Sequence, residues 1–163
     1  MNTILKVCFV CHGNICRSPL AQGVMETLIK QEELENKIIV SSAGVSGWHV
    51  GEPPDARMQD TARQHGISLN SRALHFQGHD FQQLDLVLAM DHSNMETLKA
   101  LRPAAETREK LFLFRSFDPE NNGDLEVPDP YYGGGKGFER VYEMVERTCP
   151  KILEHMKLKL HEG

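Results

Sequence analysis

The fold is decided at residues 7–21, VCFVCHGNICRSPLA. The apolar run Val7–Val10 predicts a buried strand, and a helical pattern begins at Pro19. Residues 11–18 therefore form a short loop between this strand and the N-terminus of a helix. In such a loop, backbone N–H groups and the positive end of the helix point at an enclosed anion.

Two side chains of this loop carry reactive chemistry. Cys11 stands at its start and Arg17 near its end. A helix N-terminus and a nearby arginine favour the thiolate form of a cysteine, and a planar guanidinium matches two phosphoryl oxygens. We therefore predict a phosphoryl-transfer site with Cys11 as the nucleophile. The residues expected to bind the phosphate are His12, Gly13, Asn14, Ile15, Cys16, Arg17 and Ser18.

The motif C-x5-R-S after an N-terminal strand, combined with Asp129 in the segment Val127–Tyr132, resembles the low-molecular-weight protein-tyrosine phosphatase family. The resemblance runs from about Lys6 to the final helix. Cysteine and arginine at this spacing also occur in unrelated phosphatases and reductases, so the Asp-Pro-Tyr-Tyr element makes the match specific. Further matching stretches are Ser42-Ala43-Gly44, Trp48–Gly51, Pro53–Asp55, Asp80-Phe81 and Leu88–Asp91 with Asn94.

This resemblance implies hydrolysis of protein phosphotyrosine, and of small aryl phosphates, through a cysteinyl-phosphate intermediate. Cys11, Arg17 and Asp129 are the expected catalytic residues. Because transfer of this kind depends on positioning and charge stabilisation, neither a metal nor another cofactor is expected. The expected partner is a tyrosine-phosphorylated protein, whose identity the sequence does not give.

Asp129 is the predicted general acid. A phenolate leaving group needs a proton and the water of a second step must lose one, and a single carboxyl group can serve both steps. An aspartate in a proline-rich turn more commonly orders the turn, but the resemblance favours catalysis. The flanking prolines should stiffen this segment, and Tyr131 and Tyr132 should shield Asp129 from solvent. The preceding acidic residues are expected to form a solvated surface: Asp118, Glu120, Asp124 and Glu126.

Substrate specificity is expected from apolar side chains around the loop. The predicted wall consists of Ile15, Trp48, Tyr131 and Tyr132. These side chains would sandwich a phenyl ring, and the depth of the slot would select phosphotyrosine over the shorter phosphoserine. An ordinary core position is the alternative for Trp48. His12 and His49 are expected beside the walls.

Ser18 is expected to have two roles. It is predicted to be the N-cap of the first helix, with Pro19 at the first helical position. The resemblance implies that its hydroxyl also donates toward the nucleophile sulfur and helps the thiolate leave in the second step.

Other side chains are expected to support the loop. Asn14 tolerates positive φ and should bond with Ser42 or Ser71, although relatives place histidine where Ser71 stands. Asp91 is expected either to orient Arg17 or to be a buried structural aspartate at a strand end.

The chain has four cysteines. Cys8 and Cys11 form C-x-x-C, but no second cysteine pair or close histidine pair completes a zinc site. Cys8 and Cys149 are therefore predicted to be buried hydrophobic residues. For Cys16, the resemblance implies a reversible disulfide with Cys11 that protects the nucleophile from over-oxidation, and simple packing beneath the loop is the alternative.

The rest of the chain alternates strands and helices. Further strands are predicted at 38–40, 84–89 and 111–114, and helices at 20–36, 53–66, 94–101 and 138–160. We predict a single α/β domain over residues 1–163, with an open four-stranded parallel sheet flanked by helices on both faces. The phosphate loop would lie between its first strand and first helix. Residues 115–137 are too rich in Pro, Gly, Asn and Asp for regular structure, and a loop of this length is usually functional.

Bulk composition fits one globular domain. The chain has 163 residues, of which 40% are hydrophobic and 25% charged, with a formal net charge of −5. Negative charge argues against nucleic acid or a membrane surface as the main partner. Residues 1–12 lack the features of a signal peptide, and no window approaches a membrane span, so a cytoplasmic location is expected. For the oligomeric state, both a monomer and a weak homodimer are retained.

Three other functions compete with this one. Thiol-dependent arsenate reductases share the fold and loop but relay electrons through two further cysteines near mid-chain, and this sequence has none between Cys16 and Cys149. Protein-arginine phosphatases of the same fold have threonine where Ile15 stands, and the larger apolar side chain favours a planar aromatic substrate. A catalytically silent phosphopeptide-binding module is disfavoured because four residues are retained together: Cys11, Arg17, Ser18 and Asp129.

Overall fold

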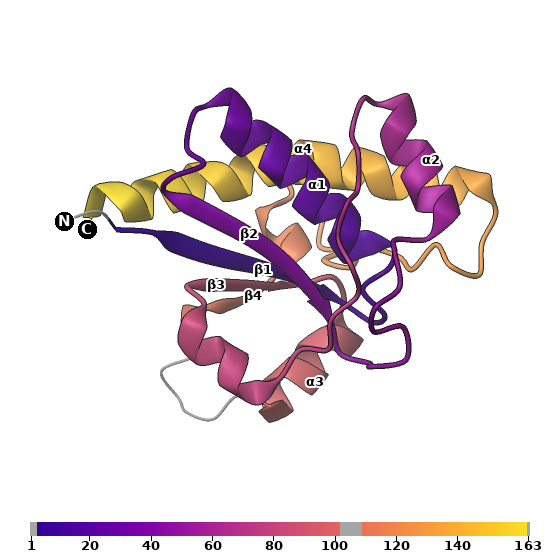
Figure 1. Ribbon diagram of the computed structural model, residues 1–163, viewed down its shortest axis with the longest axis horizontal. Helices are drawn as coiled ribbons and strands as arrows, with labels where there is room; N and C mark the ends of the chain where they lie inside the picture. Colours follow the sequence, from indigo (N-terminus) through magenta and orange to yellow (C-terminus); the bar gives the residue numbers. More distant parts are fainter. Residues whose placement is uncertain (1–2, 102–108, 163) are drawn as a thin grey trace.

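The computed structural model describes residues 3–101 and 109–162. Four strands form one sheet in the order β2-β1-β3-β4, and every neighbouring pair is parallel. The strands are β1 (Leu5–Cys11), β2 (Ile38–Gly44), β3 (Leu86–Ala89) and β4 (Leu111–Leu113). Figure 1 shows the strands running toward a common end, where the loop after β1 lies. The predicted open parallel sheet, with the loop between the first strand and first helix, is confirmed.

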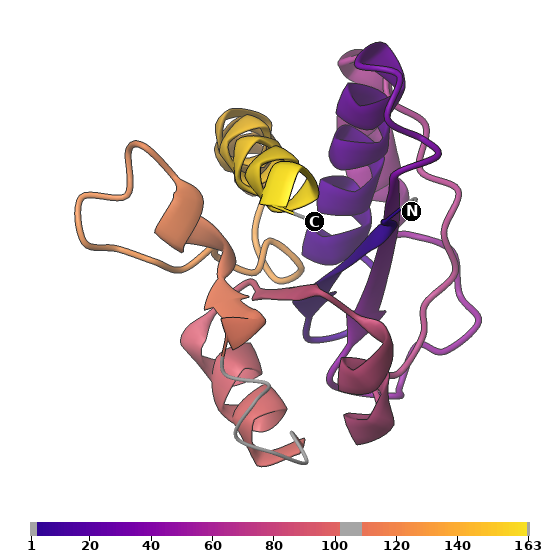
Figure 2. The ribbon, with the colours of Figure 1, turned by 90° about the vertical axis from the view of Figure 1, so that its left-hand side faces the viewer.

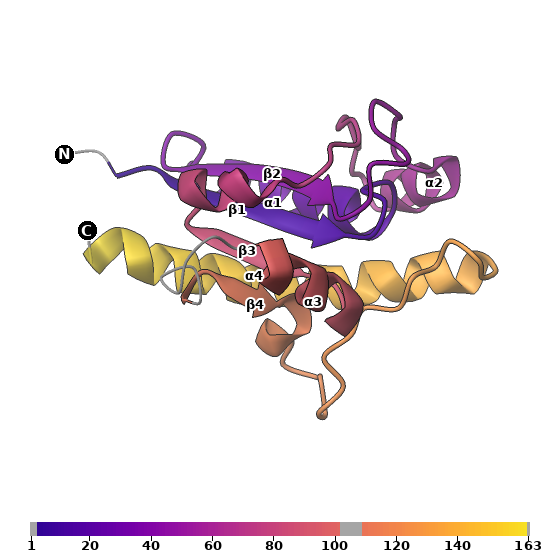
Figure 3. The same ribbon diagram turned by 90° about the horizontal axis from the view of Figure 1, so that it is seen from below.

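Helices cover both faces of the sheet. One face carries α1 (Arg17–Gln31), α2 (Ala56–Gln64) and α4 (Gly135–Glu162), with α1 and α4 side by side (Figure 2). The other face carries α3 (His92–Leu101) and the short 3₁₀ helix η1 (Gly78–Gln83), which lie in front of the sheet in Figure 3. The two layers therefore leave the ends of the central strands open, and the carboxyl ends are where ligands bind in such sheets.

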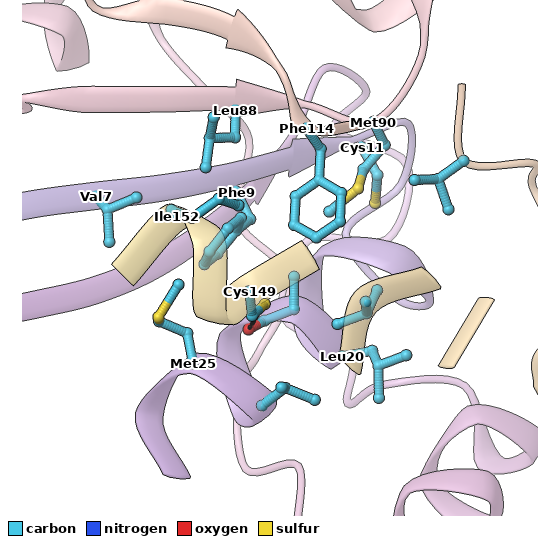
Figure 4. Packing of buried hydrophobic residues seen from close by; sticks show 14 of the residues in the cluster. Val7, Phe9, Cys11, Leu20, Met25, Leu88, Met90, Phe114, Cys149 and Ile152 are labelled. Atoms are coloured by element: carbon cyan, nitrogen blue, oxygen red, sulfur yellow. Dashed lines mark hydrogen bonds between the residues drawn. The ribbon is translucent and has the colours of Figure 1, made fainter. Parts of the chain in front are cut away.

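The central strand β1 is buried on both sides, and its side chains alternate between two hydrophobic clusters. Val7, Phe9 and Cys11 face α1 and α4, whereas Cys8 and Val10 face α3 and η1. Figure 4 shows Val7, Phe9 and Cys11 along β1, with Cys11 last and packed beside other buried side chains. Strand period alone therefore places the Cys11 thiol on the face that α1 covers.

Several predicted boundaries are confirmed and others are wrong. The end of the second helix at Gly66 is confirmed, with a Gly66 φ of 79°, but α2 begins at Ala56 with Asp55 as its cap and not at residue 53. β2 continues beyond residue 40 to Gly44, and α1 ends at Gln31. Phe114 leaves β4 and begins a short 3₁₀ helix, η3 (Phe114–Phe117).

The predicted cap of the first helix is wrong. Helix α1 begins at Arg17 with Cys16 as its N-cap, and no side chain caps it. Ser18 lies in the first turn, where its hydroxyl contacts Cys11 and Asn14. Pro19 is tolerated in the same turn, since the first turn of a helix does not use its N–H groups.

The expectation of a solvated acidic surface is wrong for Asp118. Its side chain is fully buried and forms ion pairs with Arg115 and Arg147. Burial would raise its pKa, but hydrogen bonds from Arg147, the Glu120 N–H and Arg115 lower the pKa of Asp118 to about 2. Asp118 therefore stays ionised in the protein interior. Among the described helices, none is long and apolar enough to cross a membrane.

Candidate active site

Neighbouring segments hold the loop at residues 11–16 in place by hydrogen bonds to its carbonyl groups. Three of them accept backbone hydrogen bonds, from Val45 to Cys11 (3.0 Å), from Ser46 to His12 (2.9 Å) and from Asp55 to Ile15 (2.8 Å). In a planar trans peptide, the C=O and the following N–H point in opposite directions. The outward carbonyls therefore turn the following N–H groups toward the inside of the loop, an arrangement typical of backbone nests that bind anions.

The Cys11 thiol has two hydrogen-bonding neighbours. The Asn14 N–H donates to its Sγ at 3.3 Å, and the Ser18 Oγ lies 2.9 Å from it. Since Ser18 Oγ accepts a 2.7 Å hydrogen bond from Asn14 Nδ2, its own hydrogen can point to the sulfur at 2.9 Å, which is nearer than its other acceptor, the Ala43 carbonyl at 3.5 Å. This geometry matches the expected donation from Ser18 toward the nucleophile.

Asn14 shapes the loop through its backbone and its side chain. Its φ is 59°, in the left-handed region that asparagine tolerates. The predicted bond with Ser42 or Ser71 is wrong, because Asn14 Oδ1 accepts from the Leu74 N–H at 2.9 Å and its amide donates to Ser18. The Ser42 hydroxyl bonds instead to the Gln22 side chain at 2.6 Å.

Arg17 is the central cation of the site, and its side chain is only 2% exposed. Its Nη1 donates to Asp91 Oδ2 at 2.7 Å and to the Val127 carbonyl at 3.0 Å. Its Nη2 lies 3.6 Å from Asp129 Oδ2. Burial alone would lower the pKa of Arg17, but Cys11 and the two carboxylates raise it above its usual value. This hydrogen bond is the contact that the predicted orientation of Arg17 by Asp91 requires.

Asp129 lies at the mouth of the site, and its side chain is 38% exposed. Its Oδ1 accepts a 3.0 Å hydrogen bond from the Tyr131 N–H, which tightens the turn. The prediction that the two tyrosines shield Asp129 from solvent is wrong in this structure, because the Tyr132 side chain points outward and is 91% exposed. The carboxyl group is therefore accessible to both a substrate and water.

One cavity of about 260 Å³ brings the predicted residues together. Cys11 and Arg17 line it with Asp129, and the predicted walls line it as well: Ile15, Trp48, Tyr131 and Tyr132. Trp48 is 85% exposed, so the alternative of a core position is wrong. The cavity thus combines a thiol, a guanidinium and a carboxyl group with aromatic sides. Ser71 and Ser42 do not line it.

Sequence analysis missed Arg57, which holds the aromatic wall. Its guanidinium forms two hydrogen bonds with Asp55, of 3.0 and 2.8 Å. The same group lies 5.4 Å from the Tyr131 ring centroid and 4.8 Å from that of Phe138. These rings are more than 70 residues away in the sequence, so no local pattern indicated the contact. His49, which was expected near the walls, also lines the cavity.

All four cysteines are free thiols and are buried. Burial raises the pKa of Cys8 to about 12 and that of Cys149 further. Cys8 faces the other side of the sheet from Cys11, and Figure 4 shows Cys149 on α4, away from Cys11. Their predicted roles as buried hydrophobic residues fit this burial. Within the described residues, no cluster of three or more His, Cys, Asp or Glu side chains is suited to hold a metal ion.

A family model for low molecular weight phosphotyrosine protein phosphatases matches residues 6–162. The chain belongs to this family. A low molecular weight protein-tyrosine-phosphatase from Streptomyces coelicolor is 44% identical to this phosphatase over 149 residues, which cover 91% of each chain. The family match over residues 6–162 includes the loop after β1 and the segment that carries Asp129.

Solved structures agree with the assignment to this phosphatase family. A protein tyrosine phosphatase from Entamoeba histolytica superimposes with a TM-score of 0.90 at 36% identity, covering 95% of this chain and 98% of that chain. A Drosophila arginine phosphatase superimposes with a TM-score of 0.84 at 34% identity, covering 94% and 98%. The fold is therefore shared by phosphatases whose names specify different phosphoamino acids.

The Asp91–Arg17 pair predicts the outcome of replacing Asp91. Asp91→Ala leaves the buried guanidinium without its closest carboxylate, so kcat/KM for p-nitrophenyl phosphate should fall by about 10- to 100-fold through misplacement of Arg17. Asp91→Asn keeps an acceptor and should lose less. Asp91 also accepts from the Asn94 N–H at 2.7 Å, so thermal unfolding of both variants should be measured. Lower stability with unchanged kinetics would reduce Asp91 to a structural residue.

Proposed function

We propose that this phosphatase hydrolyses protein phosphotyrosine and small aryl phosphates through a phosphate covalently bound to Cys11. The observation that supports it most is the convergence of Cys11, Arg17 and Asp129 on one cavity with aromatic walls. The thiol supplies a nucleophile, the guanidinium supplies fixed positive charge, and the carboxyl group supplies a proton.

In the first step, Cys11 Sγ attacks phosphorus, and an S–P bond forms as the P–O bond to the phenol breaks. Arg17 and the inward N–H groups of the loop stabilise the charge on the phosphoryl oxygens. Asp129 gives its proton to the departing phenolate, which leaves as a neutral phenol. Its exposed position beside Arg17 supports this role, since a leaving group at the cavity mouth would be within its reach.

In the second step, water attacks the phosphorus of the cysteinyl phosphate. Asp129, now ionised, accepts a proton from that water, and the S–P bond breaks to release phosphate and the Cys11 thiolate. Ser18 donates toward the departing sulfur, a role supported by the 2.9 Å separation between Ser18 Oγ and Cys11 Sγ. No step consumes a reductant or a cofactor.

The depth and walls of the cavity support selection of an aromatic substrate. Cys11 lies at a buried position, whereas Trp48 and Tyr132 are exposed at the rim. A phosphotyrosine side chain spans from rim to floor with its ring between aromatic groups. A phosphoserine side chain has no ring to fill the same space and would leave the phosphate above the loop.

Two other activities of the same fold are weighed against this one. The structural similarity to an arginine phosphatase favours phosphoarginine as the second candidate substrate, but the apolar Ile15 in the wall supports a planar aromatic ring. Arsenate reduction would need a relay of thiols. The thiols of Cys8 and Cys149 face other parts of the core, so they do not support such a relay.

The partners and location form part of the same proposal. The substrate is a tyrosine-phosphorylated protein, and the enzyme acts in the cytoplasm as a monomer or weak homodimer. Four unpaired cysteines are typical of proteins in reducing compartments. The net charge of −5 supports a partner that is neither nucleic acid nor an anionic membrane surface.

We also propose that Cys16 protects Cys11 from oxidation. Peroxide converts the Cys11 thiolate to a sulfenic acid, and the Cys16 thiol then condenses with it to a disulfide and releases water. Both side chains line the same cavity. Burial, followed by the charges of Asp55 and Cys11, raises the pKa of Cys16 above its usual value. Cys16 is therefore a protonated thiol, which peroxide attacks slowly, and it must give up its proton as its sulfur attacks the oxidised Cys11.

The proposed activity is tested by rates on matched phosphotyrosine, phosphoserine and phosphoarginine peptides. We expect phosphotyrosine to be hydrolysed fastest, because only its ring fills the walled slot. Cys11→Ser should abolish turnover and still bind inorganic phosphate, since Arg17 and the loop amides remain. A higher rate on phosphoarginine would assign the second candidate function instead.

The acid role predicts a defect that depends on the leaving group. Asp129→Asn should lower kcat/KM for phenyl phosphate by about 10²- to 10⁴-fold, the range usual for general acid catalysis. The loss should shrink for 2,4-dinitrophenyl phosphate, whose phenolate leaves without a proton. A loss of equal size on both substrates would remove Asp129 from this role.

The redox role predicts reversible inactivation. Wild-type enzyme inactivated by brief exposure to hydrogen peroxide should recover with dithiothreitol, whereas Cys16→Ser should lose activity permanently under the same exposure. Cys8→Ser is the matched control and should recover like wild type, since Cys8 faces the other side of the sheet. Equal recovery of all three proteins would show that Cys16 only packs beneath the loop.

A further inference from the structure

A buried ionic cluster lies beside the segment that leads to Asp129. Asp118, from the turn after η3, is its centre and has no solvent-exposed side-chain surface. It accepts hydrogen bonds from Arg115 Nε at 2.8 Å and from Arg147 Nε and Nη2 at 2.8 and 3.0 Å. The Glu120 N–H also donates to it at 2.8 Å. The carboxylate is therefore fully paired, as a buried charge must be.

The two arginines of this cluster differ in what else they contact. Arg115 Nη1 donates to the Glu126 carbonyl at 2.8 Å and lies 3.4 Å from Asp124 Oδ2. Arg147, on α4, has its other described ion pair with Glu120, at 3.9 Å. Only Arg115 therefore connects the buried carboxylate to the peptide chain that approaches Asp129.

Glu126 and Val127 are held at four further points, one of which is the 3.1 Å hydrogen bond from the Glu126 N–H to Asp124 Oδ1. The Val127 N–H donates to the Met90 carbonyl at 2.8 Å, and the Val127 carbonyl accepts from Arg17 at 3.0 Å. The Glu126 carboxylate accepts from the His92 N–H at 2.9 Å. Between this anchored pair and Asp129 stands only Pro128, whose ring fixes φ. The position of the anchored peptide therefore determines where the Asp129 side chain starts.

Asp129 itself has few restraints of its own. Its carboxyl group accepts from the Tyr131 N–H, and its distance to Arg17 of 3.6 Å exceeds that of a hydrogen bond. Because the side chain is exposed, its alignment with a leaving group depends on the backbone that carries it. The restraint that Arg115 supplies is thus relevant to catalysis as well as to folding.

We propose that Arg115 is a positioning residue for the general acid, holding the Glu126 peptide at the place that aligns Asp129 with the leaving oxygen. Asp118 fixes the guanidinium, Arg115 fixes the Glu126 carbonyl, and Pro128 transmits that position to Asp129. This inference rests on the proposed role of Asp129. Asp118 remains ionised throughout the pH range of an activity assay because the pKa of its carboxyl group is about 2.

The experiment compares Arg115→Met with its matched control, Arg147→Met. Both variants remove one arginine from Asp118, but only the first removes the hydrogen bond to the Glu126 carbonyl. For phenyl phosphate, Arg115→Met should lower kcat/KM by about 10-fold, as expected for a small misplacement of a catalytic group. For 2,4-dinitrophenyl phosphate it should change kcat/KM by less than about 2-fold, because little acid catalysis is needed. Arg147→Met should lower the melting temperature without distinguishing the two substrates.

A double variant separates positioning from a general structural effect. In the Asp129→Asn background, Arg115→Met should cause no further loss on phenyl phosphate, because the group it positions is already absent. If Arg115→Met does not fold, Arg115→Lys takes its place in the experiment. Lysine keeps the charge near Asp118 but lacks the fork that reaches both Asp118 and the Glu126 carbonyl.

Three results would overturn the inference. Equal losses on both substrates for Arg115→Met would make Arg115 a structural residue, and so would losses that add in the double variant. These outcomes leave the role of Asp129 intact if Asp129→Asn alone depends on the leaving group. A uniform defect in Asp129→Asn would instead overturn the proposed acid and this inference with it.

Discussion

The site depends on one buried cation, the guanidinium of Arg17. Its Nη1 donates to the carboxylate of Asp91, which lies after β3, and to the backbone carbonyl of Val127. Its Nη2 lies near the carboxyl group of Asp129. A buried charge is stable only when it is paired and hydrogen-bonded, so these partners must stay in place for the chain to fold well. Three segments that are remote in sequence are thereby brought to one point. The proposed nucleophile and the proposed acid are close there because Arg17 directly follows the loop that carries Cys11 and its guanidinium lies beside Asp129.

Much of the fold could be predicted from the sequence because its signals are local. The apolar run of β1 and the helical pattern after Pro19 fixed the strand, the loop and the helix. The period of two along β1 explains why Cys11 and Cys8 face opposite sides of the sheet. These inferences need only neighbouring residues. Asp129 differs, because its proline-rich surroundings alone favour a turn residue and its role as the acid was predicted from the resemblance to the family.

The features that could not be predicted depend on partners far along the chain. The acidic segment from Asp118 to Glu126 looks solvated in sequence, yet Asp118 is buried because Arg147, from α4, reaches it. Ser18 looks like a helix cap in sequence, but the helix begins one residue earlier, and the Ser18 hydroxyl also accepts a hydrogen bond from the Asn14 side chain. Arg57 lies over the Phe138 ring because α2 packs against α4. Tertiary contacts override local preference in each case.

The exposure of the rim has a thermodynamic consequence. Trp48 and Tyr132 present large aromatic surfaces to water, at 85% and 91% exposure. A substrate ring that packs against them removes apolar area from water on both sides, which gives binding a negative heat-capacity change. The enthalpy of binding then becomes more favourable as temperature rises, while the entropy gain shrinks. Recognition of the ring and recognition of the phosphate, which is largely electrostatic, should therefore respond differently to heat and to salt.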